Sequence, residues 1–209
     1  MIDYDERVLG PRPWTLEQSN WAARLAASAA PGPLLELCAG AGQIGLAAAV
    51  LAGRDLCQVE ADPVAAGYAA ENAARAGWAD RVDLRIARLD EALRADERFP
   101  LVLADPPYLR TAEVADWPDD PVRAIDGGAD GLAVTRAVLA VAAAHLIGGG
   151  HLLLQVAGAA QAAAVVDQPE CGRDFAAGDV RSVDERRAVL HLVRRGSGVC
   201  PPVGPGAPS

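Results

Sequence analysis

The residues best suited to chemistry form the tetrad Asp105-Pro106-Pro107-Tyr108. The two prolines fix the backbone and remove two N–H donors, which leaves carbonyl oxygens as acceptors beside the Asp105 carboxylate. Two acceptors facing one nitrogen can hold an amino or amide NH₂ by both hydrogens and turn its lone pair toward an electrophile. Tyr108 can stack on a planar amide or a heterocycle. The alternative is a plain turn after a buried strand, but the strand, the acid, the prolines and the ring coincide where parallel sheets bind ligands.

A second segment, Glu36-Leu37-Cys38-Ala39-Gly40-Ala41-Gly42-Gln43-Ile44-Gly45, follows the pattern strand, tight turn, helix. Its glycines let a ligand lie against the main chain, and the free N–H groups at the helix start suit a nucleotide-like group. The segment lacks the lysine and Ser/Thr pair that holds a triphosphate. Glu36 would repel a pyrophosphate and suit a cationic ligand. The alternative is a glycine turn that only packs the strand on the helix.

Glu60 ends the next expected strand, twenty residues after Gly40. A carboxylate at this place can accept hydrogen bonds from both ribose hydroxyls of a nucleoside. The alternative is a solvated acid at a strand end, and the glycine segment makes the ribose role the better interpretation. Asp62, which precedes Pro63, is expected to cap a helix.

The elements that position these residues alternate between strand and helix, which predicts an α/β fold: a doubly wound, mainly parallel, seven-stranded sheet covered on both faces, with an antiparallel C-terminal hairpin. The expected strands are 34–38, 55–60, 81–86, 101–104, 151–156, 180–183 and 187–193. The expected helices are 15–30, 46–52, 63–76, 91–95, 131–146 and 159–166. Thr15 and Gln18 form a candidate capping box, and Asp130 is a candidate helix cap. A long polar loop is expected over 109–129, and such loops are often functional.

The length of 209 residues fits one domain over 1–195, which includes an N-terminal segment and helix over 1–30. Residues 196–209 are rich in Gly and Pro and are expected to be disordered. Hydrophobic residues make up 51% of the chain but aromatic residues only 4%, so the helices must pack on small side chains.

The formal net charge of −9 disfavours nonspecific tracking along a phosphate backbone, which needs a basic stripe. The four cysteines show no CxxC spacing and the three histidines are scattered, so no metal site is expected. The acidic N-terminus does not have the pattern of a secretion signal, and no apolar run reaches membrane-spanning length. We therefore expect a cytoplasmic protein with reduced thiols and no membrane association.

Taken together, these motifs resemble class I S-adenosylmethionine-dependent methyltransferases, and within them the protein-(glutamine amide nitrogen) methyltransferases that modify release factors. The resemblance spans about residues 8–193. It is carried by the segment Val8 to Pro13, the loop Glu36 to Gly45, the segment Val59 to Pro63, the tetrad at 105–108, and Asp126-Gly127-Gly128-Ala129-Asp130-Gly131-Leu132 with Arg136.

The resemblance implies a Rossmann-like methyltransferase fold and S-adenosyl-L-methionine as cofactor. It implies a cofactor site of Glu36, Cys38, Ala39, Gly40, Gly42, Ile44, Glu60, Ala61, Arg88, Leu89 and Asp105. It implies catalytic residues Asp105, Pro106, Pro107 and Tyr108, and a substrate site of Arg12, Pro13, Trp14 and Tyr108. No metal is needed for direct displacement of the methyl group.

The sequence departs from the family pattern at several positions. Asp105 stands where the glutamine-modifying enzymes usually have Asn, and Asp is common there among enzymes that methylate nucleobase amines. Cys38 replaces the first loop glycine, and Arg88 stands where an acid would face the adenine, with Asp90 close by. Trp14 follows Pro13 where an acid is expected, and we find no counterpart of the family's helical N-terminal domain.

Three functions remain open on this basis. The first is methyl transfer to a planar nitrogen, with a protein glutamine amide as the expected acceptor and a translation factor as a candidate partner. The second is methyl transfer to a nucleobase amine, which Asp105 favours and the acidic net charge opposes. The third is a cofactor-binding protein without catalysis, against which the intact tetrad argues.

Overall fold

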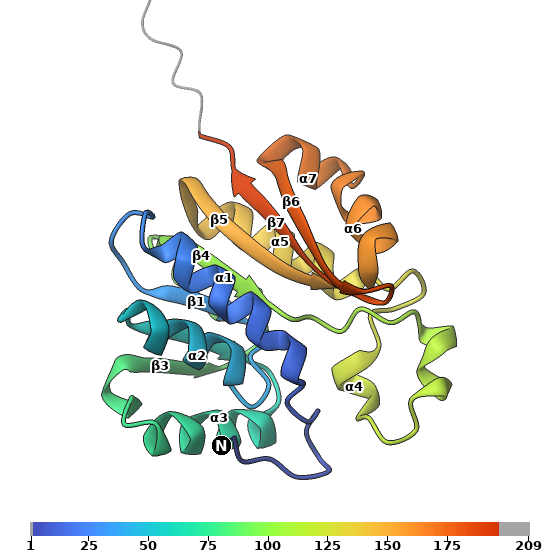
Figure 1. The fold of residues 1–209 in the computed structure, drawn as a ribbon, viewed down its shortest axis with the longest axis horizontal. Helices are drawn as coiled ribbons and strands as arrows, with labels where there is room; N and C mark the ends of the chain where they lie inside the picture. The colour runs from blue at the N-terminus through green and yellow to red at the C-terminus, as the bar shows by residue number, and fades with distance from the viewer. Residues whose placement is uncertain (1, 197–209) are drawn as a thin grey trace, which may run out of the picture.

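The computed structural model describes residues 2–196, which form a seven-stranded sheet with helices on both faces (Figure 1). The strands are β1 (Leu34–Leu37), β2 (Leu56–Glu60), β3 (Val82–Ile86), β4 (Phe99–Ala104), β5 (Leu146–Val156), β6 (Phe175–Asp184) and β7 (Arg187–Arg194). Their order is β3-β2-β1-β4-β5-β7-β6. The first five are parallel, whereas β7 runs antiparallel to β5 and β6. This confirms the expected mainly parallel sheet with an antiparallel hairpin at its end.

The helices form two layers around the sheet (Figure 1). On one face lie α1 (Leu16–Ala26) and α2 (Gln43–Ala52), with α3 (Pro63–Arg75) beside α2. On the other lie α5 (Ala133–His145), α6 (Gly158–Val166) and α7 (Pro169–Asp174). Short 3₁₀ helices span Pro13–Thr15, Ala79–Arg81 and Thr111–Asp116, and α4 covers Val122–Ile125.

Each face of the sheet has its own apolar core. Leu34, Leu101 and Leu103 face α1 and α2, where Trp21 is packed among alanines. Alternate residues of the same strands face α5 and α6. Because β1 and β4 are buried on both faces, they are apolar runs in the sequence without polar alternation, apart from Glu36. Glu36 therefore stands out as a buried acid in a central strand.

The capping box expected at Thr15 and Gln18 is wrong. Thr15 precedes α1 in helical backbone conformation and its hydroxyl donates to the Arg12 carbonyl. Gln18 is buried and donates to the carbonyls of Ala104 at 3.1 Å and Leu153 at 2.9 Å. Gln18 thus ties α1 to the last residue of β4 and to β5, and this tertiary contact replaces the local one.

Several expected element limits also change. Residues 91–95 form turns rather than a helix, α1 ends at Ala26, and α7 and the first part of β6 were not predicted. The loop expected over 109–129 contains a 3₁₀ helix and α4. Asp130 does accept a hydrogen bond from the Leu132 amide at 3.0 Å, but α5 begins at Ala133. The tail expected over 196–209 lies outside the described residues except for Gly196.

Among residues 2–196, no helix has the length and the apolar composition that crossing a membrane requires.

Candidate functional site

The turn between β1 and α2 has a left-handed backbone at three positions. The φ angles are 58° at Cys38, 56° at Gly40 and 80° at Gly42. This backbone favours glycine, so Cys38 holds a conformation that costs a side-chain-bearing residue about 1 kcal/mol. Burial, reinforced by three nearby carboxylates, raises the pKa of the Cys38 thiol, so it stays protonated.

Glu36 lies beneath this turn and is buried. Its Oε1 accepts from the Gly45 amide at 2.8 Å and its Oε2 from Gln58 Nε2 at 2.7 Å. A Cβ at Gly45 would lie 2.3 Å from Oε2, so only glycine fits there. Desolvation raises the pKa of Glu36 to about 7, although both hydrogen bonds oppose the shift. Glu36 is therefore bonded to the protein through both oxygens and supports the glycine turn from below.

Glu60 lies at the end of β2 and faces the same turn. Its Oε2 accepts from the Gly40 amide at 2.7 Å, and its Oε1 accepts from the Asp62 amide at 2.8 Å. Each oxygen keeps a lone pair for another donor. Asp62 caps α3 as expected, because its Oδ1 accepts from the Val64 amide at 3.0 Å.

Asp105 follows the last residue of β4, at the same edge of the sheet as Glu60. Burial raises the pKa of its carboxyl to about 7. Burial also raises the pKa of the neighbouring Tyr108, which remains a neutral phenol.

A cleft of about 330 Å³ joins these groups. Five of the residues predicted for the site line it: Gly40, Glu60, Ala61, Asp105 and Pro107. Ligand sites of small-molecule size begin at about this volume. The structure thus brings Gly40 of the glycine turn and Asp105 and Pro107 of the tetrad together in one cleft, whereas Pro106 and Tyr108 do not line it.

The wall of the cleft facing the sheet edge comes from residues outside the predicted site set, although Val8 and Leu9 belong to the segment Val8 to Pro13 that carries the resemblance. Arg7, Val8 and Leu9 line it from the N-terminal segment, and Arg123 lines it from α4. The Arg123 guanidinium pairs with Asp62 at 2.5 Å and donates to the Arg7 carbonyl at 3.3 Å. No local pattern in the sequence marks Arg123, which lies in the segment expected to be a loop.

The residues predicted to bind substrate do not line this cleft; Arg12 and Trp14 contact other side chains. The Arg12 guanidinium pairs with Asp120 at 2.6 Å, and the Arg187 guanidinium carbon lies 4.0 Å from the centre of a Trp14 ring. The charges of both arginines act on Tyr108, which links these side chains to the tetrad. Arg187 is thus a neighbour of the candidate substrate site that sequence reasoning missed.

Other predicted residues lie apart from the cleft surface. Gly42 in the turn and Ile44 in α2 are buried, with Ile44 in the apolar core, and Ala39 is buried as well. Arg88 is exposed and pairs with Asp90 at 3.4 Å in the loop after β3, where Leu89 is half-buried. Pro13 is exposed at the start of the first 3₁₀ helix, and Pro106 is buried in the tetrad.

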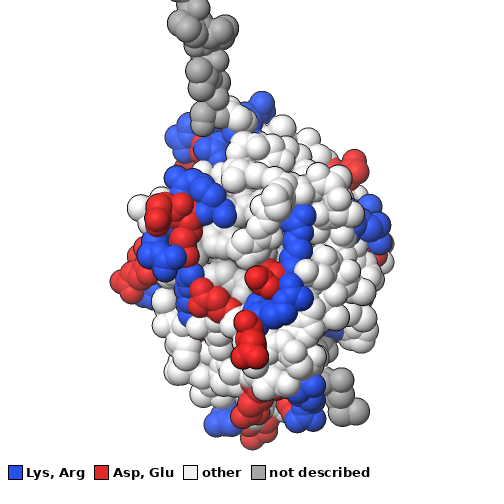
Figure 2. All heavy atoms as spheres, turned by 90° about the vertical axis from the view of Figure 1, so that its left-hand side faces the viewer, with Lys and Arg blue, Asp and Glu red and all other residues white. Residues whose placement is uncertain are grey.

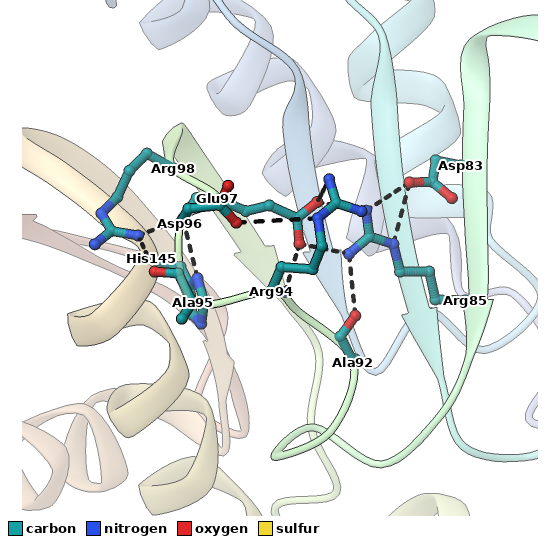
Figure 3. A network of polar contacts seen from close by, with 9 residues as sticks. All are labelled: Asp83, Arg85, Ala92, Arg94, Ala95, Asp96, Glu97, Arg98 and His145. Atoms are coloured by element: carbon teal, nitrogen blue, oxygen red, sulfur yellow. Dashed lines mark hydrogen bonds and ion pairs between the residues drawn. The ribbon is translucent and has the colours of Figure 1, made fainter.

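A second hollow, of about 380 Å³, lies at the opposite edge of the sheet, where the parallel strands begin. Figure 2 views this face and shows side chains of both charges around the hollow. Arg85 pairs there with Asp83 at 2.6 Å and Glu97 at 2.7 Å (Figure 3). Its positive charge is balanced by these partners, and parallel sheets bind ligands at the other edge, so we place the functional site in the carboxyl-edge cleft.

No protein-family model matches the chain. The chain is 35% identical to the release factor glutamine methyltransferase of Gloeobacter violaceus over 207 residues, which cover 94% of this chain and 71% of that protein. It is 35% identical to the ribosomal protein uL3 glutamine methyltransferase of Bordetella pertussis over 129 residues, covering 58% of this chain and 42% of that protein. The chain thus spans most of the first relative and less than half of the second.

Solved methyltransferase structures share the fold. The hMettl16 catalytic domain in complex with an RNA hairpin of the MAT2A 3′UTR aligns with a TM-score of 0.72 and 16% identity over 94% of this chain and 77% of that chain. The N-methyltransferase NodS of Bradyrhizobium japonicum in complex with S-adenosyl-L-homocysteine aligns with a TM-score of 0.60 and 18% identity over 88% of both chains. The sheet order, the shared cleft and the extent of the match to the Gloeobacter protein lead to one conclusion: the chain belongs to the release factor glutamine methyltransferase family.

Proposed function

We propose that this chain transfers a methyl group from S-adenosylmethionine to the side-chain amide nitrogen of a glutamine in a protein. One observation carries the proposal. Asp105 and Pro107 line the same cleft as Gly40 of the glycine turn and Glu60. A methyl donor held by the glycine turn would then lie beside an acceptor held by the tetrad.

The residues of the cleft fit such a cofactor. The sulfonium and amino groups of S-adenosylmethionine are cationic, and the cleft offers the carboxylates of Glu60 and Asp62. Glu60 is held by two backbone amides, so it is already ordered and could accept hydrogen bonds from ribose hydroxyls through its remaining lone pairs. The glycine turn lets the ligand approach the main chain.

When bound, the cofactor supplies a methyl group that is open to nucleophilic displacement. The protein orients the acceptor: Asp105 and the Pro106 carbonyl accept the two hydrogens of the amide nitrogen, and Tyr108 stacks on the amide plane. A carbon–nitrogen bond forms as the carbon–sulfur bond breaks, and the nitrogen loses one proton. The ionised Asp105 carboxylate can accept that proton, because its pKa of about 7 leaves it largely ionised above neutral pH.

Methyl transfer to a nucleobase amine is the second candidate, and Asp105 is the observation that favours it. An exocyclic amine offers the same two hydrogens to the tetrad, and Tyr108 can stack on a base. The net charge of −9 gives the chain little general attraction to nucleic acid.

The test uses the purified chain, radiolabelled S-adenosylmethionine and a cell extract. We expect label in macromolecules that protease releases and nuclease does not. Label released by nuclease would replace the glutamine proposal with the second candidate. Calorimetry with unlabelled cofactor comes first, because a chain that fails to bind the cofactor would contradict both.

A further inference from the structure

One side chain that takes no part in the proposed reaction is hydrogen-bonded to the tetrad. Gln161 lies in the first turn of α6, and its Nε2 donates to the Tyr108 carbonyl at 2.8 Å and to the Gly131 carbonyl at 3.4 Å. Its Oε1 accepts from the Ala157 amide at 2.7 Å, at the junction of β5 and α6. One half-buried side chain thus joins the tetrad to the end of the adjacent central strand.

A second observation concerns the glycines of the segment 126–132. A Cβ at Gly127 would lie 2.7 Å from the Pro107 carbonyl oxygen, and a Cβ at Gly131 would lie 2.6 Å from the Tyr108 carbonyl oxygen. Real Cβ atoms do not approach that closely, so only glycines at these positions let the segment 126–132 pack directly against the tetrad backbone. The same Cβ at Gly131 would lie 3.0 Å from Gln161 Nε2, so the segment and Gln161 meet at one carbonyl.

Backbone hydrogen bonds fix this contact. The Leu109 amide donates to the Ile125 carbonyl at 3.0 Å, and the Gly127 amide donates to the Leu109 carbonyl at 2.8 Å. The Thr111 amide donates to the Gly128 carbonyl at 2.9 Å. Residues 125–131 therefore fold back onto the tetrad, and Gln161 bonds to the tetrad from α6. We call residues 125–131 together with Gln161 the brace.

We propose that Gln161 is a positioning residue for methyl transfer, a role that rests on the proposed function. It acts through the Tyr108 carbonyl: it fixes the end of the tetrad so that Asp105 and the Pro106 carbonyl face the acceptor nitrogen. Two prolines remove the N–H groups at 106 and 107, so the tetrad has few backbone bonds of its own and depends on partners from outside. A small displacement of a reacting group is enough to slow an oriented displacement strongly.

The variant Gln161→Glu removes the Nε2 donor, and with it the bonds to the carbonyls of Tyr108 and Gly131. The carboxylate still accepts from the Ala157 amide, but it cannot donate to the Tyr108 carbonyl. Gln168→Glu is the matched control, because Gln168 Nε2 also donates to a carbonyl, that of Ala164 at 3.1 Å, near the end of α6. Gln161→Met removes all three side-chain bonds without adding charge and takes the place of Gln161→Glu should that variant not fold.

We expect kcat to fall about tenfold in both Gln161 variants, the size of one lost hydrogen bond. The KM for cofactor and the calorimetric cofactor affinity should stay at the wild-type values, because Gly40 and Glu60 are untouched. Gln168→Glu should match the wild type in kcat. Equal losses of kcat and cofactor affinity, or a kcat equal to that of the control, would overturn the proposal.

Hydrogen exchange supplies a readout that needs no acceptor. The amides of Leu109 and Thr111 are bonded to the brace, so we expect their exchange to accelerate about tenfold in Gln161→Glu relative to Gln168→Glu. Unchanged exchange would refute the positioning role whether or not the chain transfers methyl groups. Accelerated exchange in a chain that methylates nothing would leave the brace standing and contradict only the proposed function.

Discussion

The carboxyl of Asp105 changes its charge close to neutral pH because burial raises its pKa to about 7. In relatives with the usual Asn, an amide oxygen would accept the same hydrogen bond without any titration. The residue that departs from the family pattern therefore changes the expected pH dependence of the reaction. It leaves the acceptor geometry of the tetrad unchanged, since both side chains present an oxygen at the same distance from the backbone.

We expect the transfer rate of the wild type to rise with pH between about pH 6 and pH 8, because the ionised carboxylate is the form that holds and deprotonates the acceptor. Asp105→Asn keeps an acceptor oxygen and does not titrate, so its rate should be lower and flat over this range. Rates at saturating cofactor measure both profiles. A flat wild-type profile would show that Asp105 does not titrate in the reaction.

Asp105→Ala serves as the control for geometry. It has no acceptor oxygen, so transfer should be lost at every pH while calorimetry still gives a cofactor affinity near the wild-type value. A parallel loss of cofactor affinity would show that Asp105 holds the cofactor rather than the acceptor.

At the scale of elements, the unit formed by β1, the glycine turn and α2 depends on one buried acid. Glu36 binds the Gly45 amide in the first turn of α2 and Gln58 from β2, so it ties three elements together. A carboxylate at a helix N-terminus is favourable, which offsets part of its desolvation. The close contact at Gly45 leaves this unit no room for a larger residue.

We therefore expect Gly45→Ala to lower the free energy of unfolding by about 2 kcal/mol, because the new methyl group displaces the buried Glu36 carboxylate. Gly67→Ala is the control: Gly67 lies in α3, and a Cβ there meets nothing within 4 Å. That variant should gain about 0.5 kcal/mol from helix propensity. Urea unfolding compares the two, and equal stabilities would contradict the role given to Gly45.

At the scale of the whole molecule, the carboxyl and amino ends of the parallel strands carry different features. The carboxyl edge holds the cleft, whereas the amino edge holds ion pairs centred on Arg85 (Figure 3). The Arg85 and Glu97 side chains are only 17% and 13% exposed. The Arg85 partnership lowers the pKa of Glu97 to about 2. Since this folded-state pKa lies below the unfolded value of about 4.3, the pair stabilises the fold above about pH 4 and its contribution is lost as the pH falls toward 2.

Glu97→Gln should lower the free energy of unfolding by about 2 kcal/mol at neutral pH, less than for a fully buried pair, because it leaves Arg85 with one partner fewer in a poorly solvated place. Cofactor affinity and kcat should not change. Urea unfolding and calorimetry on the same preparation test both statements. A loss of cofactor affinity would mean that the two edges are coupled.

The sequence by itself determined the alternation of strands and helices, the glycine turn and the tetrad. Each of these depends on local properties: apolar runs, backbone freedom at Gly40 and Gly42, and the fixed backbone of Pro106 and Pro107. Parallel strands then bring their carboxyl ends to one edge, so the shared cleft could also be predicted. The capping box predicted at Thr15 was wrong because Gln18 bonds to two strands that are distant in the sequence, and local patterns do not indicate such contacts.

Only the tertiary structure decided which groups support the site. Arg123, Arg187 and Gln161 reach it from segments far along the chain, and no spacing in the sequence marks them. It also showed that Glu36 faces protein donors rather than the cleft surface. Hydrogen bonds and close contacts between distant segments depend on how the elements pack in three dimensions. A pattern along the chain reflects only interactions between residues that are close in the sequence.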